Sequence, residues 1–406
     1  SALLITLESD TRSYRELKGY MDDLSDRLRR IESVSNLRPY GVQQEQISVY
    51  ADPERLAAYG IGEKTLSAAL AAQGLDQVVF VPEKRAADLG KNEPRGVKTI
   101  RAMTVRQSDA LFFFRKAQRS VPAIEGQIDM AGVTLIHAHT LFTDGSIAAR
   151  LAKKHGLPYA VTLRYSDLSA IWKYEPHLRP MARRILGGAA RVVCLGGAAK
   201  EKVLGWFTGA ARDALADKLR VIPNGLDPAW LDGAPRTAAH MPVRVGFAGR
   251  MNERKRPLDA LNAAHEAGYA VAACGDGPLK ETFCAAMRPQ DRYLGRISGM
   301  DAMKAFYADC DVLLVPSSAE TFGMVYLEAM SQGVPVLYTK GQGFDGQFPE
   351  GEVGYAVPCG DVRAQAQALG RVMQGYAERS KRCIEGARRY AWPRIAGMWM
   401  ELYREI

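Results

Sequence analysis

The strongest chemical signal in the sequence is a pair of glutamates, Glu320 and Glu328, in the segment DVLLVPSSAETFGMVYLEAMSQGVPVL at 311–337. An apolar run predicts a strand that ends at Pro316, and a helix is predicted to begin near Met324 and to carry Glu328 about one turn in. Between strand and helix lies a loop of small and polar residues: Glu320, Thr321, Phe322 and Gly323. Both carboxylates are therefore expected at the same edge of a sheet.

This loop suits a ligand that carries hydroxyl groups and phosphates. A carboxylate can accept hydrogen bonds from two neighbouring hydroxyls, as on a ribose or a sugar. The backbone N–H groups of Phe322–Val325 lie at the start of the predicted helix, where they favour a phosphate or another anion. The residue types alone leave a second interpretation open, which is a surface loop with two solvated glutamates.

Two further turns between a strand and a helix carry glycines and cations. The segment GFAGRMNERKRPLDAL places Gly249, Arg250 and Lys255 after a predicted strand, and CGDGPLKE places Gly275 in a similar turn. Glycine lets the chain pass close to a ligand, while arginine and lysine can neutralise phosphate oxygens. The second turn is a weak signal by itself. For the first, an ordinary basic loop remains the alternative.

Two histidines follow a predicted strand in the segment LIHAHTLFTDG, namely His137 and His139. A histidine at a strand end can contact a substrate, and it can equally be a buried structural residue. The sequence alone leaves both interpretations open.

From Asp76 onward, strands alternate with helices, which is typical of doubly wound α/β folds. In the first half, elements are expected at 78–81, 133–138, 146–155, 159–163, 180–186, 192–195 and 198–206. In the second half, after the linker Thr237–Pro242, they are expected at 243–248, 257–267, 270–274, 279–287, 292–294, 300–308, 312–315, 325–332, 334–338, 362–373 and 376–389. Two such domains bind ligands at the carboxyl ends of their sheets.

In order and spacing, these motifs resemble the retaining glycosyltransferases of the GT-B fold, and more narrowly family four (group 1). The likeness rests on Gly249-Arg250 with Lys255, on GDGP, on YADCDVLLVPSSAETFG and on LEAMSQGVPVL. It implies an α/β protein with two Rossmann-like domains that face a cleft. The acceptor-side domain would cover 76–238 and the nucleotide-sugar-binding domain 239–390.

The resemblance also implies roles for single residues. Glu328 would bind the ribose hydroxyls of a UDP- or GDP-sugar, and Glu320 would contact the transferred sugar. Positive charge at the donor diphosphate would replace a metal ion, and no cofactor is implied. The implied catalytic residues are Glu320, Arg250, Lys255 and His139. The implied donor-binding residues, besides Glu328, are Gly249, Gly275, Thr321, Phe322, Gly323 and Met324.

The acceptor side departs from the family pattern. The segment VTLRYSD has Arg164 and Tyr165 where the family commonly has His-Gly, and these two residues with Asp167 are the implied acceptor contacts. The acceptor would be a glycan or a lipid-linked molecule in cell-envelope polysaccharide or glycolipid synthesis. Residues 391–406 resemble the C-terminal helix that returns to the first domain.

The amino-acid composition excludes several classes of protein. The 406 residues are 47% hydrophobic and 24% charged, which excludes a disordered, collagen-like or small disulfide-stapled protein. Six cysteines without metal or redox spacing favour free thiols in the cytoplasm. The sequence shows neither a membrane span nor a signal peptide. The net charge of +9 favours an anionic partner, and the basic segment 176–191 predicts either peripheral contact with the membrane's inner face or a solvated surface. No nucleic-acid-binding module is evident.

Residues 1–75 differ from the remainder in charge. They carry nine basic and eleven acidic side chains, a net of −2 against +11 for the rest. Their pattern predicts a small β-α-β-α segment with strands at 2–8 and 46–51 and helices at 14–31, 53–59 and 64–73. The run from Ser13 to Gln73 resembles part of a porter subdomain of resistance-nodulation-division efflux transporters. This likeness implies a chimera that lacks the first strand of the glycosyltransferase family and the glycine-rich loop that follows that strand.

Two functions are therefore carried forward. The first is a retaining glycosyltransferase, with transfer activity impaired by the replaced N-terminus. The alternative is a catalytically inactive protein that binds a nucleotide sugar or serves as a scaffold.

Overall fold

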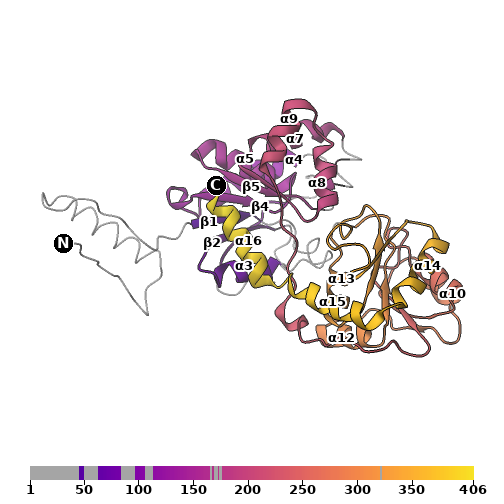
Figure 1. The fold of residues 1–406 in the computed structure, drawn as a ribbon. Helices are drawn as coiled ribbons and strands as arrows, with labels where there is room; N and C mark the ends of the chain where they lie inside the picture. The colour runs from indigo at the N-terminus through magenta and orange to yellow at the C-terminus, as the bar shows by residue number, and fades with distance from the viewer. Residues whose placement is uncertain are drawn as a thin grey trace, which may run out of the picture.

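The computed structural model describes residues 45–49, 63–83, 97–105, 113–164, 167–168, 172, 176–320 and 322–406. They form two α/β domains and a last helix that runs from the second domain back to the first (Figure 1). The elements expected at 2–8, 14–31 and 53–59 lie outside the described residues. The chain therefore has the two Rossmann-like domains that the sequence predicts.

The first domain is built on a parallel sheet of seven strands in the order β3-β2-β1-β4-β5-β6-β7. Its strands are β1 (Glu45–Val49), β2 (Asp76–Pro82), β3 (Lys98–Ala102), β4 (Leu135–Ala138), β5 (Tyr159–Thr162), β6 (Arg191–Cys194) and β7 (Leu219–Val221). Its helices are α3 (Glu63–Ala71), α4 (Phe113–Glu125), α5 (Thr143–His155), α7 (Arg179–Gly188), α8 (Gly197–Leu204) and α9 (Gly209–Lys218). The sequence pattern did not predict β3, α4, α9 and β7.

Strand β1 occupies the centre of this sheet. Ile47 lies opposite Val78 of β2 on one side and Ile136 of β4 on the other, and both pairings are parallel. The expectation of a missing first strand is therefore wrong, because a segment assigned to a separate unit supplies it. Helix α3 also belongs to this domain, so the charge step near residue 75 does not mark a structural boundary.

Both faces of the first sheet are covered. Ile136 and Val192 pack in a core with α4, α5 and α7, whereas their neighbours Leu135 and Val193 pack in a second core with α3 and the last helix. This alternation follows from the two-residue period of a strand. Such strands are continuously apolar, which is why their positions were predictable.

The second domain holds six parallel strands in the order β10-β9-β8-β11-β12-β13. They are β8 (Arg244–Ala248), β9 (Ala270–Cys274), β10 (Arg292–Tyr293), β11 (Val312–Leu314), β12 (Val336–Thr339) and β13 (Gly354–Val357). The helices are α10 (Pro257–Glu266), α11 (Lys280–Ala285), α12 (Met300–Ala308), α13 (Met324–Ser331), α14 (Val362–Met373) and α15 (Tyr376–Arg388). Only β13 was not predicted in this domain.

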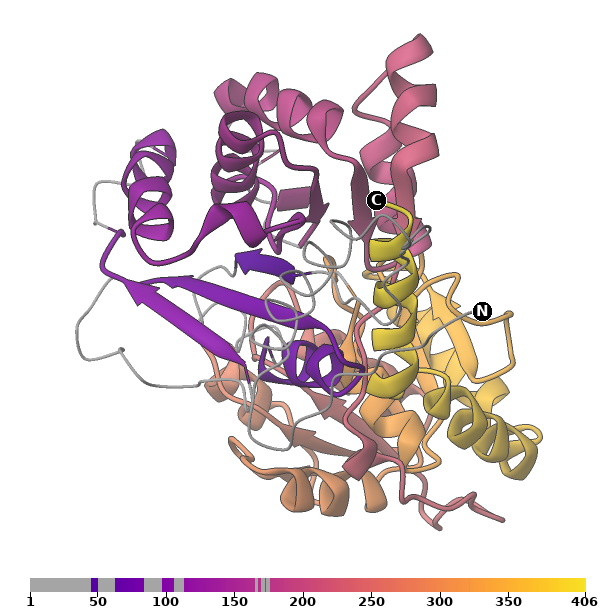
Figure 2. The ribbon, with the colours of Figure 1, turned by 90° about the vertical axis from the view of Figure 1, so that its left-hand side faces the viewer.

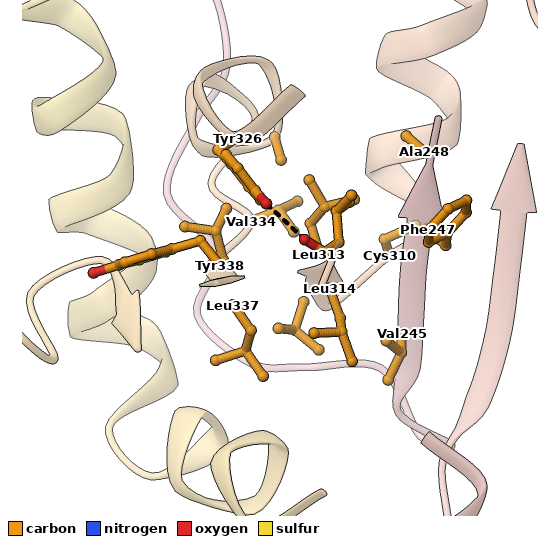
Figure 3. Close-up of a cluster of buried hydrophobic side chains, with 14 of the residues drawn as sticks. Val245, Phe247, Ala248, Cys310, Leu313, Leu314, Tyr326, Val334, Leu337 and Tyr338 are labelled. Carbon is orange, nitrogen blue, oxygen red and sulfur yellow. Dashed lines mark hydrogen bonds between the residues drawn. The ribbon is translucent and has the colours of Figure 1, made fainter. Parts of the chain in front are cut away.

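A tightly packed core fixes α13 against the second sheet. Figure 3 shows Tyr326 of α13 beside Tyr338 of β12, with Leu313 and Leu314 of β11 between them and β8. The buried Tyr326 hydroxyl donates a hydrogen bond of 2.7 Å to the carbonyl of Val315. The start of α13 is therefore held at the end of β11.

Helix α16 (Trp392–Arg404) returns to the first domain and lies along α3 (Figures 1 and 2). Where it begins, Trp392 packs on Gly225, at which an added Cβ would lie 2.3 Å from the indole ring. Where it ends, Glu405 forms ion pairs of 3.1 Å with Arg191 and with Arg220. In the described part of the chain, no helix combines the length and the apolarity needed to cross a bilayer.

Candidate functional site

Three neighbouring strands of the second sheet, β9, β8 and β11, end at one edge, and we call the loops that follow them (249–256, 275–279 and 316–323) the loop cluster. The loops are joined backbone to backbone. The amide of Gly249 donates to the carbonyl of Cys274 at 3.1 Å, and that of Ser318 donates to Arg254 at 2.8 Å. The motifs found separately in the sequence thus form one continuous surface.

Glycines make this close approach possible. Gly275 has a φ of +136°, and a Cβ added to it would lie 1.8 Å from the carbonyl oxygen of Gly249. Gly277 has a φ of +155°, and its added Cβ would lie 2.4 Å from the carbonyl oxygen of Met251. No other residue type fits these two positions without separating the loops.

Lys255 and Glu320 form an ion pair between the loops after β8 and β11. Each side chain is only 13% exposed. The backbone around Glu320 is fixed as well, since its amide donates to Gln342 and its carbonyl accepts from Gly343, both at 3.0 Å. A cation and a carboxylate are therefore held together, partly shielded from water. The sequence singled out both residues but did not predict that they pair with each other.

Arg250 is exposed in the loop after β8, and the described residues offer it no ion-pair partner. It therefore lies in the loop cluster but is not tied to the Lys255–Glu320 pair. Thr321, the remaining polar residue of the third loop, lies outside the described residues.

The start of α13 has the geometry of an anion-binding helix N-terminus. Gly323, the residue before the helix, has a φ of +85°, and a Cβ there would lie 2.4 Å from the ring of Tyr326. Phe322 is 2% exposed, and its ring packs between Phe344 and Tyr390, so only its backbone could face a ligand. Met324 opens the helix and is half-buried.

Glu328 lies one turn into α13, as predicted, and is half-buried. Burial raises the pKa of its carboxyl group, and a hydrogen bond from the hydroxyl of Tyr307 (2.9 Å) opposes that shift. Tyr307, on α12, was not among the predicted site residues. Its contact depends on how α12 packs against α13, which no local sequence pattern reveals.

In the first domain, His137 is a structural residue. Its ring is fully buried and is hydrogen-bonded to the hydroxyls of Tyr403 and Thr162, both at 2.8 Å. The ring also lies 4.1 Å from that of His139 and 4.8 Å from that of Trp399, measured between centroids. Burial, helped by Arg164, lowers its pKa to about 3, so it is neutral.

His139, Arg164 and Asp167 are brought together at the ends of β4 and β5. The Arg164 side chain donates to the carbonyl of His139 and to the side-chain oxygen of Asn224, each at 3.2 Å. Asp167 accepts from the amides of Arg164 (2.9 Å) and Leu141 (3.1 Å). Burial holds the pKa of His139 well below its usual value and raises that of Asp167 to about 6. Tyr165 lies outside the described residues.

A further buried carboxylate, Asp144, was not predicted. It lies in the first turn of α5, and one of its oxygens accepts from the Thr140 hydroxyl at 2.9 Å. Burial raises its pKa to about 7, although nearby Lys116 opposes the shift.

The two domains also touch through their loops. Gly196, before α8 in the first domain, packs so closely on the second that its added Cβ would lie 2.8 Å from the carbonyl oxygen of Gly343. Gly343 is the residue whose amide donates to Glu320. The described residues contain no group of three or more histidines, cysteines or carboxylates suited to a metal ion.

Comparison with known proteins agrees with this arrangement. Residues 64–230 match the family model described as Glycosyltransferase Family 4, and residues 234–390 match the one described as Glycosyl transferases group 1. The first match begins before residue 76, in line with the place of α3 in the first domain.

Curated relatives include phosphatidyl-myo-inositol mannosyltransferase of Mycobacterium leprae, which is 31% identical over 48% of this chain and 55% of the relative. D-inositol 3-phosphate glycosyltransferase of Corynebacterium urealyticum is 30% identical over 40% of this chain and 43% of the relative. The chain thus spans about half the length of these two relatives.

Solved structures share the fold over most of the chain. Sucrose-phosphate synthase from Thermosynechococcus elongatus has a TM-score of 0.70 at 20% identity, covering 89% of this chain and 99% of that one. Anabaena HepE, solved with UDP, has a TM-score of 0.69 at 15% identity, covering 90% and 100%. With both sheets and the loop cluster in place, the chain has the GT-B fold, and its two domains match the Glycosyltransferase Family 4 and Glycosyl transferases group 1 models.

Proposed function

We propose that the chain is a retaining hexosyltransferase that moves a sugar from a UDP- or GDP-sugar to a glycan or lipid-linked acceptor. The Lys255–Glu320 ion pair carries this proposal, because it lies beside the helix that bears Glu328. Lys255 would bind the diphosphate, Glu320 the transferred sugar and Glu328 the ribose hydroxyls. The names of the inositol-specific relatives and the UDP complex of HepE support a lipid or polyol acceptor and a nucleotide donor.

The proposed roles imply a reaction with retention at C1. The bond between the sugar C1 and the diphosphate oxygen breaks, and the cations of Arg250 and Lys255 stabilise the negative charge that develops. The leaving oxygen takes the proton of the acceptor hydroxyl, whose oxygen then bonds to C1 on the same face. The proposal assigns neither Glu320 nor Glu328 as a covalent nucleophile. His139, with Arg164 and Asp167, would face the acceptor.

We further propose that transfer needs no divalent metal, because the two cations of the loop cluster supply the positive charge. The expected result is an equal transfer rate in Mg²⁺ and in EDTA. A rate that falls in EDTA and recovers with Mg²⁺ would assign that charge to a metal instead.

The proposal is for an active enzyme rather than an inactive nucleotide-sugar-binding protein. Impaired transfer was expected because the first strand and its glycine-rich loop were thought to be missing. Strand β1 fills the strand's position, and the residues that follow it, 50–62, lie outside the described residues. No contact among the described residues favours a purely binding role.

We also propose that the basic segment 176–191 contacts anionic lipid on the cytoplasmic side of the membrane. Arg184 is exposed, whereas Arg179 and Arg183 donate hydrogen bonds to the carbonyls of Trp172 and Trp206. Charge on such a surface attracts anionic headgroups. Cosedimentation with vesicles that contain phosphatidylglycerol should weaken in Arg184→Glu, and binding that is indifferent to both the lipid charge and this variant would refute the contact.

A panel of UDP- and GDP-sugars tests the proposed function. Incubation with one accepted donor should release its nucleoside diphosphate, and proton NMR of the product should show the anomeric configuration of the donor. Inversion at C1 would refute the retaining mechanism while leaving the transferase assignment intact.

A further inference from the structure

We propose that Tyr307 is a positioning residue whose hydroxyl orients the carboxylate of Glu328 for the two ribose hydroxyls of the donor nucleotide. This inference rests on the proposed function, because it concerns the carboxylate that the proposal assigns to the ribose. It adds a residue from α12, an element that contributes nothing else to the candidate site.

The ring of Tyr307 is fixed by its surroundings. It is fully buried, and its centroid lies 5.3 Å from that of Phe306 and 6.0 Å from that of Trp230, both edge-on. Its backbone is held too, since its carbonyl accepts from Arg236 at 2.7 Å. A rigid aromatic ring delivers its hydroxyl to one place, and that place is 2.9 Å from the Oε2 atom of Glu328.

The contact leaves the carboxylate able to bind a ligand. A carboxylate offers about four acceptor positions, and Tyr307 occupies one of them. Glu328 is half-buried and therefore keeps an accessible side, whereas Tyr307 is buried. Without the tyrosine, a flexible glutamate side chain would lose rotational freedom each time a nucleotide bound, which costs affinity.

Among the described residues, the Tyr307 hydroxyl is the group whose contact favours the charged form of Glu328. Burial disfavours the carboxylate, and the Tyr307 hydroxyl is the group that opposes this effect. Burial raises the pKa of the Cys274 thiol, on β9, to about 12, and the charge of Glu328 adds to that shift. Burial likewise keeps the phenol of Tyr307 protonated at neutral pH. Neither neighbour supplies a charge.

The test compares the affinities of Tyr307→Phe and wild type for UDP, GDP and their 2′-deoxy analogues by titration calorimetry, using the full chain. Phe keeps the ring and removes the hydroxyl. We expect about tenfold weaker binding of the preferred nucleotide. We also expect the preference for the ribose over the 2′-deoxyribose form to fall toward that of Glu328→Gln, and the double variant to bind no more weakly than Glu328→Gln alone.

Tyr159→Phe is the matched control. Tyr159 is also a buried tyrosine whose hydroxyl donates to one acceptor, the carbonyl of Ile185 at 2.6 Å, but it lies in the first domain. It should lose stability without losing nucleotide affinity. The ribose preference is a ratio of two affinities measured on folded molecules, so partial unfolding of Tyr307→Phe does not change it. A loss of packing alone would weaken the binding of the ribose and the 2′-deoxyribose forms equally.

The outcomes separate the inference from the proposed function. An unchanged ribose preference in Tyr307→Phe, together with a reduced one in Glu328→Gln, would overturn the inference and leave the donor site standing. An unchanged affinity in Glu328→Gln, or no binding of UDP or GDP by wild type, would overturn the proposed donor site and the inference with it.

Discussion

At the scale of single residues, the candidate site depends on backbone positions as much as on charged side chains. Lys255 and Glu320 meet because the loops that carry them touch, joined by the hydrogen bond from the Ser318 amide to the Arg254 carbonyl. The loop after β9 approaches the loop after β8 because Gly275 and Gly277 have no side chain. The sequence predicted the charges and the glycines. It did not predict which carbonyl each glycine faces, because that contact joins segments far apart in the chain.

Gly275→Ala should lower the free energy of unfolding by about 2–4 kcal/mol, because the new Cβ would collide with the Gly249 carbonyl. The matched control is Gly268→Ala, at a position that also has a positive φ, +77°, but no atom within 4 Å. It should cost about 1 kcal/mol, from backbone strain alone. Urea unfolding measures the free energies of both variants. Equal losses would show that the close approach of Gly275 to Gly249 does not contribute to stability.

Asp144→Asn should change how stability depends on pH. The folded-state pKa of Asp144, about 7, exceeds its ordinary value of 3.8, so between these values folded protein binds a proton that unfolded protein has lost. The unfolding free energy of wild type therefore falls as pH rises across this window. The unfolding free energy of the variant, taken relative to that of wild type at the same pH, should rise by on the order of 1–4 kcal/mol from pH 4 to pH 7. A difference that is constant with pH would contradict the burial of this carboxylate.

At the scale of elements, apolar strands and amphipathic helices were largely predictable. Helices α12 and α14 and strand β9 lie where the sequence placed them, because their residues face a core on a regular period. The short element β13 was missed. So was α4, which contains Pro122, a residue that usually ends a helix.

The main error concerned β1, and it came from reading a change in charge as a change of domain. Strand β1 and helix α3 are short, and their place becomes visible only through their partners β2, β4 and α16. Pairing between distant strands is not encoded in local periodicity. A likeness confined to local pattern therefore assigned this segment to the wrong unit.

Hydrogen exchange tests the position of β1. Because β1 lies between β2 and β4, the amides of Glu45–Val49 should exchange about as slowly as those of Leu135–Ala138. Mass spectrometry of peptides that cover the two strands measures this directly. Rapid exchange in β1 beside slow exchange in β4 would mean that the sheet does not contain this strand.

Tyr403 should contribute more to the stability of the folded protein than the charged end of helix α16 does. Tyr403→Phe removes a hydrogen-bond partner of the buried His137 and should cost about 1–3 kcal/mol of stability. Glu405→Ala removes two ion pairs from the same end of the helix, but these are exposed to solvent, so its effect should be much smaller. Thermal unfolding of the two variants measures both losses of stability. A larger loss in Glu405→Ala than in Tyr403→Phe would show that the ion pairs of Glu405 hold the helix more strongly.

At the scale of the whole molecule, two sheets from different halves of the chain present their loops to each other. Gly196 of the first domain packs on Gly343, which in turn holds the backbone of Glu320, and α16 ties the second domain back to the first. The GT-B assignment could be predicted from the sequence, because its motifs lie on contiguous segments of the second domain. The contacts between domains could not, because each depends on the final packing of both.

Release of nucleoside diphosphate from a UDP- or GDP-sugar by wild type, Glu320→Ala and Lys255→Ala tests the central claim most directly. The account predicts release by wild type with at least one donor. It also predicts rates about 10²-fold lower in both variants, because each loses one half of the pair that would face the sugar and the diphosphate. Release by Glu320→Ala and Lys255→Ala at the wild-type rate, or no release by wild type from any donor, would contradict it.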